Sequence, residues 1–155
     1  MFKPFREKKC WGNVLHVFAD DHAAVSCLEV VAGFCCSKHK HAERANLFAL
    51  HSGCVVIETQ LFGHFEKSGR VTRNILRAGS TLYVCSRMWH RFLVMESGQM
   101  TEVYYPDRGG KVDIHDIKRM DEGGSFNINE TQKLLEKEPP YKSSWIGSGS
   151  EENDS

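Results

Sequence analysis

The chain has 155 residues, and its 20 basic and 20 acidic side chains cancel at neutral pH. This length fits one domain with a sizeable core, and a balanced chain without a basic cluster excludes a nucleic-acid-binding protein. No apolar run approaches the roughly 20 residues of a membrane-spanning helix, and the charged N-terminus lacks the apolar stretch of a secretory signal. We therefore expect a cytoplasmic protein whose partner is a small molecule, with no nucleic acid and no membrane.

Short runs of β-forming residues follow one another from residue 14 to residue 105. Many short strands with turns between them are typical of an antiparallel sandwich or barrel. Residues 1–13 precede the first run and are interpreted as an N-terminal arm. Among the predicted turns are Ser52-Gly53 and Ser97-Gly98. The predicted strands cover 14–18, 24–31, 46–50, 54–59, 71–76, 81–85, 91–95 and 100–105.

A single helix is predicted late in the chain, over residues 129–136, with Asn127 or Asn129 as its cap and Pro139 as its stop. Residues 147–155 contain only Gly, Ser, Glu, Asn and Asp, a composition typical of a disordered tail. The predicted organisation is therefore the arm, a β-barrel with a C-terminal extension over 14–126, and a short helix and tail over 127–155.

Six cysteines lie scattered along the chain without a C-x-x-C pair, which disfavours a zinc ribbon or a thioredoxin-type redox site. In a reducing compartment, cysteines do not form lasting disulfides. We therefore expect most of them to be small buried hydrophobic residues.

Three of the eight histidines have a spacing that suggests a shared metal ion. His39 and His41 are two residues apart, so on an extended strand both imidazoles project from one face, roughly 7 Å apart at the backbone. His90 follows about fifty residues later, and only a closed or folded-over sheet brings it alongside this pair. Imidazole binds zinc, iron, copper, nickel and manganese. Three ligands leave an open position for water or substrate, as a catalytic metal requires.

The glycines around the histidine pair strengthen this interpretation. The pattern Gly33-x5-His39-x-His41-x4-Asn46-x6-Gly53 resembles the first conserved motif of the cupin superfamily. The resemblance implies an all-β, single-domain cupin, a double-stranded β-helix or jelly-roll barrel, with a short C-terminal helix. It also implies one divalent transition metal, such as Zn, Fe, Mn or Ni, held by the histidines and by the residue in the position of Asn46.

The stretch from Gly79 to His90 is similar to the second cupin motif in length and in its histidine. Cys85 and Arg87 stand where that motif has proline and glycine. A more specific likeness covers segments 41–48 and 116–121, which resemble the cupin domain of type II mannose-6-phosphate isomerases. This likeness implies carbohydrate chemistry.

Asn46 stands where the first motif normally has a glutamate ligand. Its amide oxygen is neutral and is a weaker ligand for a hard cation. Three alternatives follow. The site is a neutral three-histidine centre, or Glu43 or Glu102 supplies the missing carboxylate, or the metal is lost and only the pocket is kept.

An aldose–ketose isomerase needs an acid or base that moves a proton between adjacent carbons. Glu102 is the candidate base, because Glu102 and Tyr104 alternate onto one face of a late strand; a solvent-facing glutamate is the alternative. Arg119 is the second candidate catalytic residue, favoured by the mannose-6-phosphate isomerase likeness. Arginines can bind phosphate or carboxylate, and aromatic rings can stack on a sugar, although surface and core roles are the alternatives. The candidate substrate-binding residues are Arg44, Arg91, Tyr83 and Tyr104.

The leading functional hypothesis is a metal-binding cupin that acts on a sugar, a sugar phosphate or a similar small polar molecule, as an isomerase or epimerase. The second is a three-histidine iron dioxygenase of a small thiol or organic acid, which neutral ligation suits. The third is a small-molecule-binding cupin without chemistry. We also expect a homodimer, in which the aromatic residues of the N-terminal arm cover a partner's sheet edge.

Overall fold

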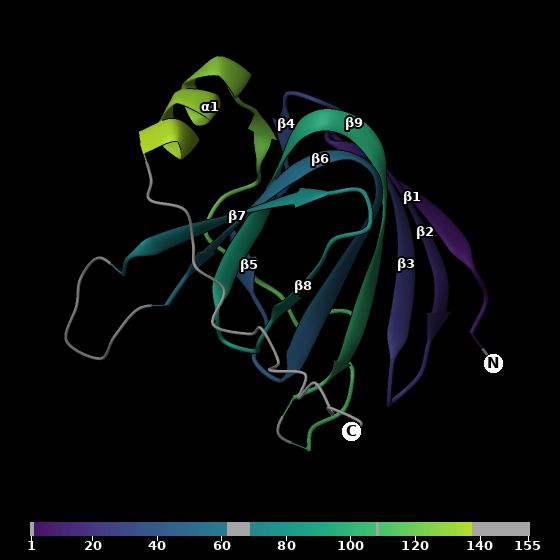
Figure 1. Ribbon diagram of the computed structural model, residues 1–155. Coiled ribbons are helices and arrows are strands. Elements are labelled where there is room, and N and C mark those ends of the chain that lie inside the picture. The colour runs from purple at the N-terminus through teal and green to yellow at the C-terminus, as the bar shows by residue number, and fades with distance from the viewer. Residues whose placement is uncertain (1, 62–68, 108, 138–155) are drawn as a thin grey trace, which may run out of the picture.

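The computed structural model describes residues 2–61, 69–107 and 109–137. Figure 1 shows a curled sheet dominated by two long, bent strands, β6 and β9, with the helix α1 at one end. The elements are β1 (Phe5–Lys9), β2 (Gly12–Ala19), β3 (Ala24–Val30), β4 (Phe34–Cys35), β5 (His39–Lys40), β6 (Arg44–Gln60), β7 (Val71–Arg77), β8 (Thr81–Val84), β9 (Trp89–Pro106), β10 (Lys118–Arg119), β11 (Gly124–Ser125) and α1 (Ile128–Lys137).

The strands pair in antiparallel fashion, in the order β1-β2-β3-β9, and β9 then pairs with β6 along most of its length. Strand β6 also pairs with β7 and β8. The all-β class and the short C-terminal helix are confirmed. The N-terminal segment contributes the strand β1, which pairs with β2 at one end of this order. The expected disordered tail, 147–155, lies outside the described residues.

Two predicted turns are bends inside continuous strands. The register between β6 and β9 shifts around Ser52, so each strand changes direction without ending. At this bend a Cβ on Gly98 would lie 1.9 Å from the carbonyl oxygen of Ser52. Gly53 has a φ of +84°, and a Cβ there would lie 2.6 Å from the carbonyl oxygen of Glu96. Only glycine fits at these two positions, because the two backbones approach so closely.

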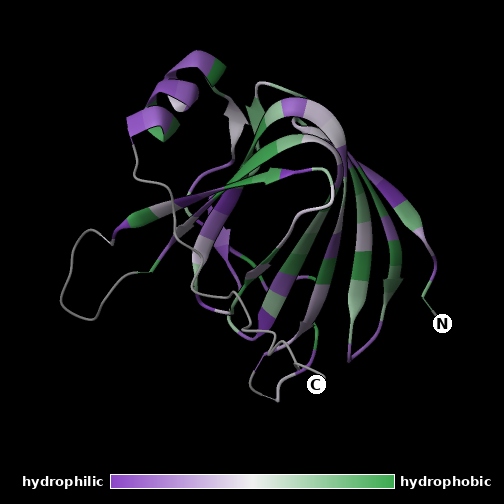
Figure 2. Ribbon diagram, viewed as in Figure 1, coloured by the Kyte–Doolittle hydropathy of each residue, from purple (hydrophilic) through white to green (hydrophobic). Residues whose placement is uncertain are grey.

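The concave side of the sheet holds the main core. Strand β3 alternates buried and accessible residues along its length, as expected for a sheet with one covered face, and Figure 2 shows this alternation of hydropathy along the strands. Trp11 packs edge-on against Phe92, with ring centroids 4.9 Å apart. Trp11 therefore lies in the core of its own chain.

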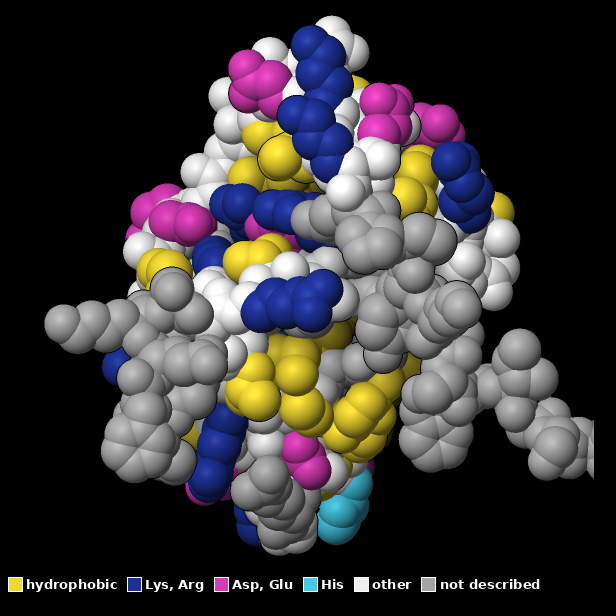
Figure 3. All heavy atoms as spheres, turned by 60° about the vertical axis from the view of Figure 1, so that its left-hand side comes forward, with side chains coloured by type: hydrophobic (Ala, Val, Ile, Leu, Met, Phe, Trp, Pro, Cys, Tyr) yellow, Lys and Arg dark blue, Asp and Glu magenta, His cyan; other side chains and the backbone are white. Residues whose placement is uncertain are grey.

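A second, smaller cluster lies under α1, where Cys35, Val56 and Leu93 contact Phe126 and Leu135. The helix begins as predicted, because the side-chain oxygen of Asn127 accepts hydrogen bonds from the backbone N–H groups of residues 129 and 130, at 3.0 and 3.3 Å. In the face shown in Figure 3, basic and acidic side chains are interspersed around hydrophobic ones. No helix of the described residues is long and apolar enough to cross a membrane.

The cysteines only partly follow the prediction that most are buried. Cys35, Cys36 and Cys54 are buried, whereas Cys10 and Cys27 are exposed. Cys10 lies in the turn between β1 and β2, and Cys27 occupies an outward-facing position of the alternating strand β3. All six cysteines, which lie within the described residues, are free thiols.

Arg87 has a φ of 66°, the only positive value of a non-glycine residue in the described part of the chain. It stands where the second cupin motif has glycine, and its backbone N–H donates to the carbonyl oxygen of His41 at 2.6 Å. The left-handed conformation costs an L-residue roughly 1–2 kcal/mol. A glycine avoids this cost, but on folding it loses more conformational entropy, which destabilises the folded state by about 0.5–1 kcal/mol.

We therefore expect Arg87→Gly to raise the free energy of unfolding by up to about 1 kcal/mol. Urea unfolding of the variant and the parent protein measures this difference. Arg87→Ala is the matched control, because it removes the same guanidinium but keeps the Cβ. A glycine variant no more stable than the alanine variant would show that the backbone is not strained at this position.

Candidate metal centre

The three predicted ligand histidines meet at one place. His39 lies on β5 and pairs directly with His90 on β9, while His41 follows β5 by one residue. The ring centroids are 4.4 Å apart for His39 and His90, 5.0 Å for His39 and His41, and 5.3 Å for His41 and His90. Their ligand atoms all lie within 4.8 Å of one another. The predicted convergence of His39, His41 and His90 is confirmed.

The hydrogen bonds of the three rings fix which nitrogen each presents. In each ring Nδ1 faces a backbone carbonyl oxygen, so Nδ1 carries the proton and donates it. The Nε2 lone pairs are then the ligand atoms that each ring offers to an ion, and such carbonyl partners are typical of metal-ligating histidines. The acceptors are the carbonyl oxygens of Ser37 for His39 (2.7 Å), Asp116 for His41 and Met88 for His90 (3.0 Å).

The three imidazoles are neutral. Burial lowers the pKa of each ring from 6.5 to about 3, helped by the neighbouring histidines and by the positive charge of Arg44. Neutral rings with unprotonated Nε2 atoms are the form that binds a transition metal. The donor set therefore fits one divalent ion, which would gain three nitrogen ligands and keep open positions.

These pKa shifts make the metal-free protein sensitive to acid. Below pH 6.5 the unfolded chain binds protons at the three histidines, whereas the folded chain does not until the pH nears 3. The free energy of unfolding should therefore fall as the pH drops from about 7 to 5, by up to roughly 1 kcal/mol per pH unit for each histidine.

Urea unfolding of metal-free protein at several pH values tests this expectation. The raised pKa of Glu102 acts in the opposite direction, so the informative quantity is the difference in pH dependence between the parent and a His39→Asn variant. In the variant, the dependence of the free energy of unfolding on pH should be weaker by roughly the contribution of one histidine. Equal slopes for the two proteins would contradict a neutral, buried His39.

Asn46 is fully buried beside these nitrogens, on β6. Its side-chain N–H₂ lies 3.3 Å from Nε2 of His41 and 3.2 Å from Nε2 of His90, and it donates to Oε1 of Glu102 at 2.8 Å. The amide oxygen has no hydrogen-bond partner among the described residues. An oxygen is the atom of this side chain that suits a cation. The role of Asn46 as a fourth ligand stays a prediction.

Glu102 and Tyr104 lie on the same inner face of β9, as their alternation predicted. The Tyr104 hydroxyl donates to Oε2 of Glu102 at 2.5 Å. Burial raises the pKa of the Glu102 carboxyl, while the hydrogen bond from Tyr104 and the charge of Arg44 oppose that rise. Burial also raises the pKa of Tyr104 well above its ordinary value, so its hydroxyl stays protonated. The alternative of a solvent-facing Glu102 is wrong.

A cavity of about 920 Å³ opens onto this group. His39, His41, Arg44, Glu102 and Tyr104 line its inner part, and Arg119 lies on β10 directly opposite His39 in the strand pairing. The apolar part of the wall consists of rings and aliphatic side chains, including Trp11, Phe48 and Phe92. A cavity of this volume holds a small molecule, with polar groups at its inner end.

The comparisons with known proteins identify the fold. Neither a protein-family model nor a curated protein matches the sequence. Oxalate decarboxylase from Bacillus subtilis, solved at pH 4.6, matches with a TM-score of 0.60 and 15% identity, over 76% of this chain and 30% of that chain. KdgF from Halomonas sp. matches with a TM-score of 0.51 and 12% identity, over 63% of this chain and 80% of that one. The chain has the cupin fold.

A further match is an oxalate decarboxylase structure from Bacillus subtilis whose Mn(II) centres were studied, with a TM-score of 0.56 and 12% identity, over 72% of this chain and 30% of that chain. The chain thus spans less than a third of these decarboxylases. In this chain the three-histidine group by itself offers the ligand atoms for a divalent metal.

Two predicted substrate-binding residues lie away from the cavity of the cupin barrel. Arg91 follows His90 on β9 and points to the opposite side, where its Nε contacts Oε2 of Glu58 at 2.5 Å. Tyr83 is 48% exposed and stacks on Tyr105, with ring centroids 5.7 Å apart. Neither residue lines the cavity. The strand periodicity explains both cases, because residues at odd spacing from an inward-facing residue face outward.

The sequence did not single out the contribution of Asp116. Its carbonyl oxygen accepts the Nδ1–H of His41, and its carboxylate accepts the backbone N–H groups of Ala42 and Glu43, at 2.9–3.0 Å. Asp116 therefore holds both the imidazole ring of His41 and the backbone of the two residues that follow it. Its position in the segment that resembles mannose-6-phosphate isomerases was the available signal.

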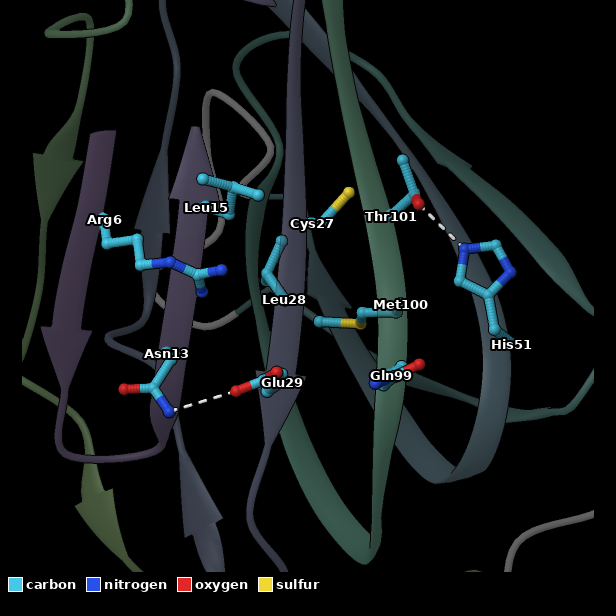
Figure 4. A pocket seen from close by; sticks show the side chains of 10 residues that line it. All are labelled: Arg6, Asn13, Leu15, Cys27, Leu28, Glu29, His51, Gln99, Met100 and Thr101. Carbon is cyan, nitrogen blue, oxygen red and sulfur yellow. Dashed lines mark hydrogen bonds between the residues drawn. The ribbon is translucent and has the colours of Figure 1, made fainter. Parts of the chain in front are cut away.

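A second hollow, of about 220 Å³, lies on the solvent-facing side of the sheet. Figure 4 shows its side chains, which come from β1, β2, β3, β6 and β9; His51 contacts Thr101 at 2.7 Å and Asn13 contacts Glu29 at 3.2 Å. None of the three clustered histidines lines it. It is therefore separate from the candidate metal centre.

Proposed function

We propose that the protein is a divalent-metal-dependent enzyme that acts on a sugar, a sugar phosphate or a similar small polar molecule, as an isomerase or epimerase. One observation carries this proposal: a buried carboxyl group, Glu102, contacts the Asn46 amide that also lies against His41 and His90, and it lines the same cavity as the histidines. A proton-transfer residue and a metal centre within one cavity are the two elements that this chemistry needs.

When bound, a divalent ion would polarise a carbonyl or hydroxyl oxygen of the substrate. Glu102 would take a proton from the adjacent carbon and return it to the neighbouring one, since its burial raises its pKa toward the working range of a general base. The Tyr104 hydroxyl, at 2.5 Å, holds the carboxylate in place. Arg119 at the cavity wall would hold a polar end of the substrate, and the apolar rings would limit access of water.

The experiment combines elemental analysis with a substrate panel. Protein purified without added metal is analysed for bound metal, and is then incubated with aldoses, ketoses and their phosphates in deuterated water. We expect one metal ion per chain and incorporation of deuterium at the carbon that receives the proton. Stoichiometric metal without exchange or turnover of any panel member would end the isomerase or epimerase proposal and favour a binding protein.

A second candidate function is a three-histidine iron dioxygenase of a small thiol or organic acid. It is favoured by the neutral ligand set, because among the described residues the clustered metal-binding group contains no carboxylate. Oxygen uptake by the ferrous protein in the presence of candidate thiols and organic acids distinguishes it from the first. An absence of uptake over this panel would count against it.

A further inference from the structure

Arg44 is a buried cation without an acidic partner. Its side chain is 3% exposed, at the first position of β6. One guanidinium nitrogen, Nη1, donates to the carbonyl oxygen of Asp113 at 2.9 Å, and Nε has no hydrogen-bond partner among the described residues. Within the same part of the chain, no carboxylate lies within ion-pair distance of Arg44. Buried arginines are normally paired, because removing the charge from water is costly.

The guanidinium of Arg44 lies at the inner end of the cavity. Its central carbon is 4.1 Å from the centroid of the Tyr104 ring, and the residue lines the cavity together with His39 and His41. Stacking on Tyr104 holds the planar group in a fixed orientation. The positive charge also contributes to lowering the pKa of all three histidines, which agrees with its position beside them.

The charges at the inner end of the cavity do not balance. Arg44 brings one positive charge, and a divalent ion on the three neutral histidines would bring two more. Glu102 is the one acidic side chain among the described residues that line the inner part, and its own hydrogen bonds come from Asn46 and Tyr104. The Asp116 carboxylate is also near Arg44 and His41, but it does not line the cavity, accepts hydrogen bonds from the backbone of Ala42 and Glu43, and offsets only one of the remaining charges. A bound anion would restore the balance and would satisfy the unpartnered Nε.

We propose that Arg44 anchors an anionic group of the ligand, a carboxylate or a phosphate, at the inner end of the cavity. The anion accepts hydrogen bonds from Nε and from the guanidinium nitrogen that does not contact Asp113. This inference deepens the proposed function and rests on it for the identity of the site: the substrate is a sugar acid, a sugar phosphate or a comparable anion, and not a neutral sugar.

The test measures anion binding to the full-length, metal-free protein by calorimetry, with inorganic phosphate and acetate as separate probes. We expect saturable binding of at least one of them, and a loss of at least about 10-fold in affinity in Arg44→Gln, as for a charge-assisted bidentate contact. Arg77→Gln is the matched control, because Arg77 is exposed on β7, outside the cavity. The probe that binds more tightly distinguishes the phosphate from the carboxylate source.

Arg44→Lys keeps the charge and loses the planar fork, so we expect it to bind the anion more weakly than the parent protein. This second variant tests the role of Arg44 in anion binding if Arg44→Gln does not fold. An affinity unchanged in either folded variant, or no binding of either probe to the parent, overturns the inference. Turnover of neutral sugars without anion binding would do so as well, and would leave the proposed function intact. Anion binding that depends on Arg44, without turnover of any substrate, would support the role of Arg44 and contradict the proposed enzymatic function.

Discussion

Replacement of His90 by alanine is expected to remove stoichiometric binding of a divalent metal ion. His90 is 2% exposed and supplies one of three Nε2 lone pairs, so its loss leaves two nitrogen ligands. Mutation of groups that merely orient a ligand costs 10–100-fold in metal affinity, and loss of a ligand should cost at least about 100-fold. Elemental analysis and titration with zinc or manganese measure the effect. Circular dichroism shows whether the variant keeps its fold.

His51→Ala is the matched control, because His51 is exposed on the outer side of the sheet and contacts Thr101. It should bind metal like the parent protein. A metal concentration 100 times the parent's dissociation constant should stabilise the parent and this control by about 2.7 kcal/mol, and should stabilise His90→Ala by at most about 0.4 kcal/mol. One tightly bound ion per chain in His90→Ala would show that the histidines are not the ligands.

The sequence was sufficient to predict most of the longer strands and the histidine group, because both depend on spacing. It did not predict β1, in the segment interpreted as an arm, or the two-residue strands β4, β5, β10 and β11. The distance between His39 and His41 places both rings on one side of an extended segment, and a β-sheet that returns on itself brings His90 opposite His39. The bends were not predictable in the same way. Gly53 and Gly98 are residues that form turns in most contexts, and only the close approach of two backbones turns them into bends.

The faces of the strands were harder to assign than the strands themselves. The alternation of side chains along a strand puts Glu102 and Tyr104 on one face and their neighbours in sequence on the other. It does not tell which face points inward when both faces carry polar residues. Arg44 and Arg91 illustrate the problem: both are arginines in strands beside a predicted ligand, yet Arg44 is buried in the cavity and Arg91 pairs with Glu58 on the other side. The pairing of β6 with β9 places Arg91 opposite Glu58, so these two side chains lie on the same side of the sheet.

Glu102→Gln is expected to lower the turnover number of the proposed isomerisation by about 10²- to 10⁴-fold, the usual contribution of a general base. The amide keeps the shape of the carboxyl group but cannot accept the substrate proton. Metal content should be unchanged, since the three histidines remain, and elemental analysis checks this. Deuterium exchange from solvent into substrate should fall with turnover. A glutamine variant with parental turnover would exclude Glu102 as the base.

Tyr104→Phe tests the same carboxyl group through its pKa. The Tyr104 hydroxyl donates to Glu102 and lowers the pKa of that carboxyl, so its removal should raise the pKa. The base acts as a carboxylate, and the acid limb of the pH–rate profile should therefore move to higher pH in the phenylalanine variant. Activity should return at sufficiently alkaline pH, which a general loss of packing would not produce. An acid limb at the parental pH would mean that the hydroxyl does not tune the base.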